Sequence, residues 1–80
     1  MKVGVKLYAA LQEYSPPGTE LGEAFPIELE GSTVGDLVNQ LGIKEEHAKI
    51  IIVNGIRIDD LSHHLNEDDQ VVIFPPIGGG

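Results

Sequence analysis

The 80-residue sequence contains no cysteine and no tryptophan, and its other aromatic residues are two tyrosines and two phenylalanines. The absence of cysteine excludes disulfide frameworks, thiolate metal sites, iron–sulfur clusters and cysteine nucleophiles. Any sulfur that this protein handles therefore cannot be carried on a cysteine side chain.

Long apolar runs and basic residues are also scarce. No apolar stretch approaches the roughly 18 residues of a membrane span, and the chain does not begin like a secretion signal, so we expect a cytoplasmic protein. Thirteen acidic residues against five basic ones give a formal net charge of −8. Such a surface repels nucleic acid and anionic lipid and suits a partner with a basic face, although it also serves solubility alone.

The first third of the chain predicts two strands. With a hydrophobic fraction of 41%, the chain can form one small core, and its length indicates one domain. Val3, Val5 and Leu7 alternate with polar residues, which is typical of a half-buried strand, and residues 25–30 (FPIELE) repeat the pattern. The proline- and glycine-containing segment Ser15–Glu23 reads as the long loop of a hairpin between them.

Apolar residues at i, i+3, i+4 and i+7 predict a helix over residues 34–41. Thr33 and Asp36 have the spacing of a capping box, and Gly42 stands where a left-handed residue ends a helix. The segment KEEHAK, residues 44–49, is compatible with one further helical turn. This helix is the best-marked element of the sequence.

The second half predicts three more strands. Asn54-Gly55 favours a type I′ turn between strands 50–53 and 56–58. A polar connector with Leu61 and Leu65 as core anchors leads to strand 70–74, which we expect to be central and parallel to the first strand. The order β-β-α-β-β-β predicts an α+β domain in which a mixed sheet of four to five strands packs on one main helix.

The C-terminal segment IFPPIGGG combines stiff and flexible residues. Pro75-Pro76 should end strand pairing and keep the chain projecting, and glycines without Cβ can thread a narrow channel. From Pro75 to Gly80 the chain reaches about 20 Å when fully extended. We therefore predict a folded domain over residues 1–75 and a flexible tail over 76–80. A glycine-rich end alone is also typical of a frayed terminus.

The carboxylate of Gly80 is the candidate reactive group. A free carboxylate is a poor electrophile, and it reacts only after its oxygen becomes a good leaving group, for example by adenylation with ATP. The sequence contains no G-x-x-x-x-G-K-[ST] motif for phosphate binding. We therefore expect no bound cofactor, and the activation, with its ATP, must come from a partner enzyme. The domain would be a substrate and not the catalyst.

The segments VKLYAALQEY, STVGDLVNQLG, VNG and LNEDDQVVIFPPIGGG together resemble the MoaD/ThiS family of ubiquitin-like sulfur carriers. The ending F-P-P-x-x-G-G is the specific part of the resemblance, which covers nearly the whole chain. The length and the long Ser15–Glu23 loop favour the small subunit of molybdopterin synthase (MoaD) over the thiamine-pathway carrier. Gly78 departs mildly from the family, in which alanine, serine or threonine is common, but Gly79-Gly80 is in place.

The resemblance implies a ubiquitin-like β-grasp fold and a cycle of activation. An E1-like adenylyltransferase of the MoeB/ThiF type would adenylate Gly80, and a desulfurase- or rhodanese-type donor would convert it to a thiocarboxylate. The tail would then enter the large synthase subunit (MoaE type) and deliver sulfur for the molybdopterin dithiolene. The residues assigned to tail threading are Gly79, Gly78, Pro76 and Pro75, and those assigned to partner contact are Phe74, Ile56 and Ile77. For Phe74 and Ile56, ordinary core packing is an equally good interpretation.

Other interpretations stay open at this point. The same fold and tail serve tungsten and thiamine pathways, and a ubiquitin-like modifier would join Gly80 to lysines of other proteins. A non-reactive β-grasp interaction module is a third class. His63-His64, with Asp59, Asp60 and Asp69 nearby in sequence, does not predict a metal site, because adjacent histidines on an irregular connector rarely converge on one ion.

Overall fold

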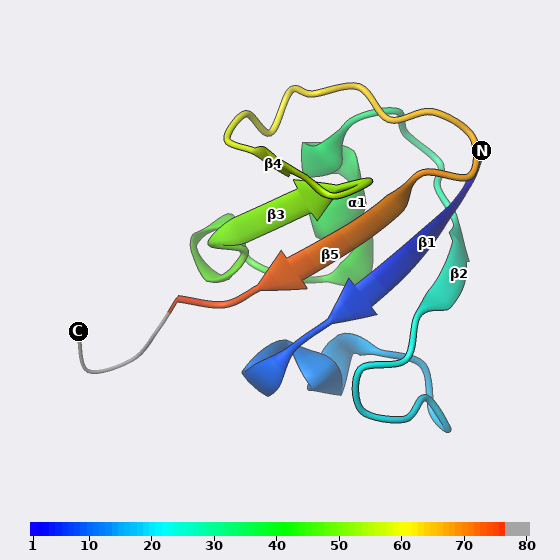
Figure 1. Cartoon of the computed structure of the whole chain (residues 1–80), viewed down its shortest axis with the longest axis vertical. Coiled ribbons are helices and arrows are strands. Elements are labelled where there is room, and N and C mark those ends of the chain that lie inside the picture. The colour runs from blue at the N-terminus through cyan, green and yellow to red at the C-terminus, as the bar shows by residue number, and fades with distance from the viewer. Residues whose placement is uncertain (77–80) are drawn as a thin grey trace.

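The computed structural model describes residues 1–76 and shows them as one mixed sheet with one α-helix and two short 3₁₀ helices (Figure 1). In chain order the elements are β1 (Lys2–Leu7), η1 (Ala9–Tyr14), β2 (Phe25–Glu28), α1 (Val34–Leu41), η2 (Glu45–His47), β3 (Ile50–Val53), β4 (Ile56–Ile58) and β5 (Gln70–Phe74). The strand order is β2-β1-β5-β3-β4. β1 and β5 run parallel, and the other neighbours are antiparallel.

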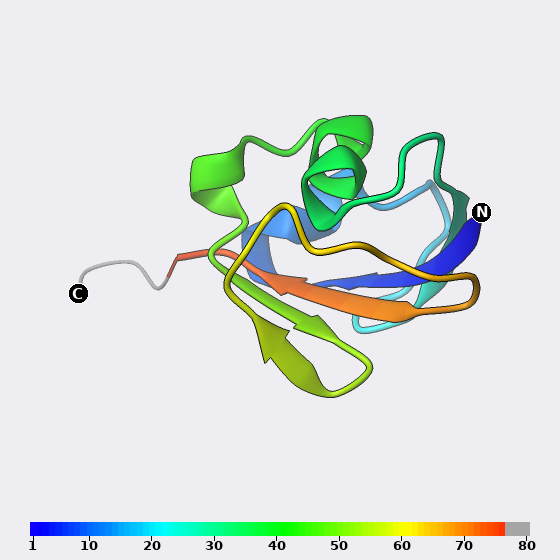
Figure 2. The same cartoon turned by 90° about the horizontal axis from the view of Figure 1, so that it is seen from above.

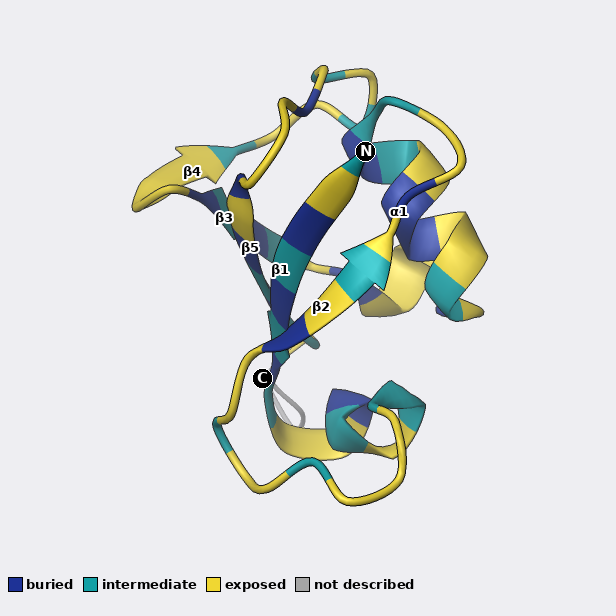
Figure 3. Ribbon diagram, turned by 90° about the vertical axis from the view of Figure 1, so that its right-hand side faces the viewer, coloured by how far each residue is buried: buried dark blue, intermediate teal, exposed yellow. Residues whose placement is uncertain are grey.

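The sheet and α1 form two layers, with α1 on one side of the sheet (Figure 2). Along β1 and β5, buried residues alternate with more exposed ones (Figure 3). The buried side chains of the three inner strands meet α1: Val3, Val5, Leu7, Ile51, Val53, Val71 and Ile73 pack with Val34, Leu37 and Val38. The prediction of a central β5 parallel to the first strand is confirmed, and so is the predicted sheet on one main helix.

Both ends of α1 are closed as the sequence predicts. The hydroxyl of Thr33 accepts a hydrogen bond from the backbone N–H of Asp36, at 3.1 Å. The Asp36 carboxylate in turn accepts from the backbone N–H groups of Thr33 and Ser32, at 3.1 and 2.9 Å. Gly42 ends the helix with a φ of 84°, in the left-handed region that favours glycine.

The connector between β4 and β5 also supports the start of α1. The backbone N–H groups of Val34 and Gly35 donate to the carbonyls of His63 and Leu61, at 2.9 and 2.8 Å. These contacts satisfy helix donors that have no partner within the helix itself. Leu65 is buried in the core and Leu61 packs against it, so both predicted anchors are confirmed.

The hairpin between β3 and β4 turns at Asn54 and Gly55, whose φ values of 50° and 84° are both positive. A type I′ turn requires this pair of left-handed residues, and the predicted turn is confirmed. The Asn54 side chain reaches across to the start of β5: its amide donates to Asp69 at 2.8 Å, and its carbonyl accepts from the backbone N–H of Gln70 at 2.9 Å.

The 3₁₀ helix η1 was not predicted. After β1 the chain turns sharply at Ala9, which has a φ of 53°. Within η1, Leu11 is the buried residue, and the side chain of Gln12 donates back to the carbonyl of Leu7 at 3.0 Å. A short 3₁₀ helix with one buried side chain produces no repeating apolar stripe, so periodicity could not reveal it.

Candidate functional site

The candidate site is the point at which the chain leaves the sheet after β5. Two backbone hydrogen bonds close the strand there: the N–H of Tyr8 donates to the carbonyl of Ile73 at 3.3 Å, and the N–H of Lys49 donates to the carbonyl of Phe74 at 3.0 Å. Pro75 and Pro76 follow, and neither has an N–H to extend the ladder. Strand pairing therefore stops on both sides of β5 at Phe74.

The end of β1 and the two 3₁₀ helices lie around this exit. β1 and β5 end at the same edge of the sheet, η1 lies next to the end of β1, and residues 75–76 continue beyond β5 (Figure 1). A hollow of about 300 Å³ opens between η1, η2 and the prolines. Its lining residues are Ala10, Leu11, Glu13, Tyr14, His47, Pro75 and Pro76. The exit is thus flanked by structured parts of the domain.

An aromatic pair lies at the exit, on the face of the sheet opposite α1. The rings of Tyr8 and Phe74 are stacked, with centroids 4.8 Å apart and planes inclined by 10°. Both residues are half-buried. Tyr8 is the last extended residue before the turn at Ala9, so the ring that meets Phe74 is placed by the end of β1.

The face of the sheet opposite α1 is the one on which Phe74 lies, and it carries several half-buried apolar side chains. They are Tyr8, Ile50, Ile52, Val72 and Phe74, and Lys6 lies among them by register. We call these six residues the uncovered face. Because Ile50 pairs with Phe74, and Ile52 with Val72, the apolar residues are contiguous across β3 and β5.

The sequence-predicted site residues separate into three groups. Gly80, Gly79, Gly78 and Ile77 lie outside the described residues. Pro75 and Pro76 form the exit, and Phe74 stands at its base. Ile56 is 67% exposed but pairs with Val53, a core residue, so its register places it on the face opposite to that of Phe74.

Tyr8 is the site residue that sequence reasoning missed. The alternation of Val3, Val5 and Leu7 predicts only that Tyr8 lies on the outward side of the first strand, and the predicted parallel pairing of the first and last strands is confirmed. The missing information was the register, since Leu7 pairing with Ile73 is what brings the next residues, Tyr8 and Phe74, together. If β1 and β5 paired two residues out of this register, every side chain would stay on the same face of the sheet, but Tyr8 and Phe74 would not meet.

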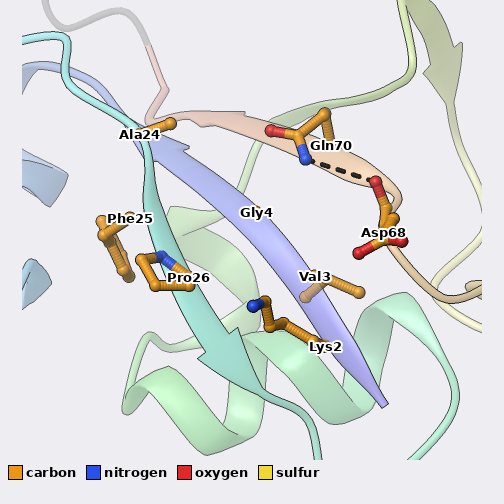
Figure 4. Close-up of a pocket in the computed structure, with 8 residues that line it drawn as sticks. All are labelled: Lys2, Val3, Gly4, Ala24, Phe25, Pro26, Asp68 and Gln70. Atoms are coloured by element: carbon orange, nitrogen blue, oxygen red, sulfur yellow. Dashed lines mark hydrogen bonds between the residues drawn. The ribbon is translucent and has the colours of Figure 1, made fainter.

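Two further hollows lie away from the exit. One of about 230 Å³ is centred on Gly4, between β2 and β5 (Figure 4). The side chain of Gln70 lies where a Cβ on Gly4 would stand, and its amide donates to the carbonyl of Asp68 at 3.2 Å. The other, of about 250 Å³, lies beside β4 and contains the exposed ion pair between Arg57 and Asp59. Lys2 and Asp68 are the charged residues that line the first hollow, and half of the residues that line the second are charged.

Three groups in the described residues have shifted pKa values, and none of them lines the exit. Hydrogen bonds from the backbone of Ser32 and Thr33 lower the pKa of Asp36, and those from Ser62 lower the pKa of Asp60. The Glu28 carboxylate, 2.9 Å from the Met1 ammonium, raises the pKa of that ammonium. Each of these pKa shifts follows from local contacts that stabilise the fold, and none of them indicates a proton-transfer site.

Residues 1–76 contain no cluster of three or more histidine, cysteine, aspartate or glutamate side chains placed to hold a metal ion. His63 and His64 instead belong to the connector, where the carbonyl of His63 accepts from α1 and His64 bridges to Thr33. Within the same described range, no helix has the length and apolar character needed to cross a membrane.

Comparison with known proteins gives one family and several structural neighbours. The sequence model of the ThiS family matches residues 5–80. No curated protein matches the chain. Among solved structures, the protein described as subunit 1 of a molybdopterin converting factor from Pyrococcus furiosus is 30% identical, with a TM-score of 0.68, and the match covers 96% of this chain and 99% of that one.

Two other neighbours are a subunit of a protein complex and a modifier protein. A complex of subunits 1 and 2 of the molybdopterin-converting factor from Helicobacter pylori contains a chain that is 26% identical over the full length of both, with a TM-score of 0.61. The small archaeal modifier protein 1 of Haloferax volcanii is 21% identical, with a TM-score of 0.66 and coverage of 95% and 98%, and at that identity it shows the fold alone. These likenesses identify the mixed sheet with its single main helix as a ubiquitin-like β-grasp.

Proposed function

This chain belongs to the ThiS family of ubiquitin-like sulfur carriers and modifiers, and from that membership we propose that it carries sulfur on the carboxyl group of Gly80. In this proposal an E1-like adenylyltransferase of the MoeB/ThiF type activates Gly80 with ATP. The protein binds no cofactor of its own and acts as a co-substrate of its partners. The sulfur is delivered to a pterin precursor within a molybdopterin synthase, of which this chain is the small subunit.

The chemistry needs one adenylyl transfer and then one acyl transfer. A carboxylate oxygen of Gly80 attacks the α-phosphorus of ATP, pyrophosphate leaves, and an acyl-adenylate forms. A donor sulfur at the oxidation level of sulfide then attacks the acyl carbon, the bond to the AMP oxygen breaks, and a thiocarboxylate remains. The absence of cysteine agrees with this scheme, since the backbone terminus carries the sulfur.

The observation that carries the proposal is the construction of the exit. Strand pairing ends at Phe74 on both neighbours of β5, and two prolines without N–H groups lead the chain away from the sheet. A terminus that must enter another protein's active site needs this departure from its own domain. The assigned threading residues Pro75 and Pro76 stand at its start.

The uncovered face next to the exit supports a protein partner. Ile50, Ile52 and Val72 are half-buried side chains on a sheet face that α1 does not cover. The centre of a protein interface is usually depleted of charged residues and more apolar than its rim. We propose that the activating enzyme and the large synthase subunit, of the MoaE type, both dock on this face, with Phe74 at its end near the tail. Ile56 lies on the edge strand β4, on the face opposite to that of Phe74. It would therefore contact only a partner that reaches around this edge of the sheet.

Two neighbours support the molybdopterin assignment over other sulfur pathways. The Pyrococcus furiosus protein is described as subunit 1 of a molybdopterin converting factor, and the Helicobacter pylori chain was solved together with subunit 2. Their lengths match this chain almost completely. A second, larger subunit is therefore the partner that we propose for this chain as well.

The test is mass spectrometry of the protein purified from its own cells, combined with ATP–pyrophosphate exchange by its E1-like enzyme. We expect exchange that depends on the carrier, and a C-terminal peptide in which one oxygen of Gly80 is replaced by sulfur. The control is the same chain extended by one residue. It keeps the fold, but the carboxyl group of Gly80 is then part of a peptide bond, so exchange should be abolished.

Other outcomes point elsewhere. A branched peptide joining Gly80 to a lysine would favour the protein-modifier function, and sulfur transfer to a thiazole precursor would favour the thiamine pathway. Absence of both exchange and modification, with partner binding intact in the extended chain, would leave a non-reactive interaction module.

A further inference from the structure

The stacked rings of Tyr8 and Phe74 stand apart from the hydrophobic core. The core cluster and the half-buried residues packed against it contain neither ring. Both rings lie on the uncovered face, at the edge of the sheet from which the chain departs. The contact therefore lies at the end of β5 and does not help to fill the space between sheet and helix.

The backbone around Tyr8 is arranged to hold its ring in this place. The Tyr8 N–H donates to the carbonyl of Ile73, and its own carbonyl accepts from the N–H of Leu11 at 3.1 Å. Between them Ala9 adopts a φ of 53°, which is costly for a residue with a Cβ. The chain tolerates this conformation at the residue that turns η1 away from β1 and leaves Tyr8 beside Phe74.

Phe74 is thereby held from both sides. Tyr8 stacks on its ring from β1, and Ile50 is its pairing partner on β3. The carbonyl of Phe74 also accepts from the N–H of Lys49. Because Pro75 follows directly, the position of Phe74 sets the point and direction in which the C-terminal segment begins.

We propose that Tyr8 is a positioning residue, whose ring orders Phe74 and so presets the start of the tail for its partner. The inference rests on the proposed activation of Gly80 for its consequence, but the ordering of Phe74 can be tested alone. Without the stack, the partner must order the base of the tail on binding. That cost falls equally on the bound substrate and the transition state, so it raises KM and leaves kcat unchanged.

The kinetic test measures adenylation of the full chain by its E1-like enzyme, as pyrophosphate release at varied carrier concentrations. We expect Tyr8→Leu, which keeps apolar bulk but has no ring, to raise KM about two- to tenfold at constant kcat. Tyr8→Phe is the matched control, and it should stay within about twofold of the wild type because it can still stack. Loss of kcat alone, or an unchanged KM in folded Tyr8→Leu, would overturn the inference.

A double-mutant cycle separates the stack from direct contact with the partner. If Tyr8 acts through Phe74, the double variant Tyr8→Leu/Phe74→Leu raises KM by less than the product of the two single effects. Effects that multiply would mean that each ring acts independently, and Tyr8 would then be an ordinary contact residue.

Amide hydrogen exchange tests the ordering without any partner. The N–H groups of Lys49 and Asn54 donate to Phe74 and Gln70, so they report on the two ends of the same β3–β5 ladder. We expect Tyr8→Leu to speed exchange at Lys49 about two- to tenfold and to leave Asn54 unchanged. Equal acceleration at both would indicate a general loss of stability and reject positioning. If the wild type shows no ATP-dependent reaction at all, the proposed function fails, while this measurement still decides the role of Tyr8.

Discussion

At the scale of single residues, Asn54 connects two parts of the chain that are distant in sequence. It supplies a left-handed conformation to the β3–β4 turn, and its side chain bonds both Asp69 and the backbone of Gln70. Asp69 is only 9% exposed, and its other carboxylate oxygen accepts from the N–H of Asn66 at 2.8 Å. One side chain therefore joins the hairpin to the start of the central strand.

We predict that Asn54→Ala lowers the free energy of unfolding by about 2–4 kcal/mol, because it loses both side-chain bonds and forces alanine to a positive φ. Asn54→Gly is the matched control, since it loses the same bonds but accepts the conformation, and it should cost less. Urea unfolding of the three proteins measures the difference. Equal losses in the two variants would show that the conformation contributes nothing.

At the scale of elements, the N-terminus of α1 is capped both by neighbouring residues and by residues distant in sequence. The capping box of Thr33 and Asp36 is local, and the sequence pattern predicted it fully. The carbonyls of Leu61 and His63, which receive the first helical N–H groups, come from a connector that has no recognisable periodicity. Spacing rules describe interactions within a few residues, so they found the first contact and could not find the second.

The Asp36 cap predicts a particular dependence of stability on pH. Its hydrogen bonds to Ser32 and Thr33 favour the charged carboxylate and lower its pKa below the usual 3.8. The folded protein therefore gains stability from this group above pH 4, roughly, and loses it as the pH falls through the lowered pKa. We expect the stability difference between the wild type and Asp36→Asn to be full near pH 6 and to shrink steadily below about pH 4.

The control for this prediction is Glu45→Gln. Glu45 is an exposed carboxylate in η2 for which the described part of the chain shows no side-chain hydrogen bond. Urea unfolding of both variants at the same pH values compares the Asp36 cap with a carboxylate that lacks such hydrogen bonds. A difference for Asp36→Asn that stays constant with pH would mean that the cap does not depend on the charge of Asp36.

At the scale of the whole molecule, the central strand separates the core from the uncovered face that we propose for partner docking. Alternation, spacing and turn residues predicted the order of the strands and the main helix, and the prolines marked the end of strand pairing. The unbroken apolar run of residues 71–74 indicated a central strand parallel to the first. The sequence could not place Tyr8 against Phe74, since this contact depends on the register between β1 and β5, which lie far apart in sequence. Register comes from packing of the whole sheet.

Val71 and Val72 test this separation directly, because they are neighbours of the same type on opposite faces of β5. Val71 is 1% exposed and faces α1, whereas Val72 is half-buried on the uncovered face. We expect Val71→Ala to cost about 1–3 kcal/mol of unfolding free energy. Val72→Ala should cost less than about 1 kcal/mol.

Partner binding should show the reverse order, measured as the dissociation constant for the E1-like enzyme at a temperature where both variants are folded. Val72→Ala removes apolar area from the proposed docking face, so it should weaken binding about two- to tenfold. Val71→Ala leaves that face unchanged and should bind as the wild type does. If Val72→Ala binds normally, the partner approaches the exit from another side, and the hollow between η1, His47 and the prolines becomes the next surface to probe.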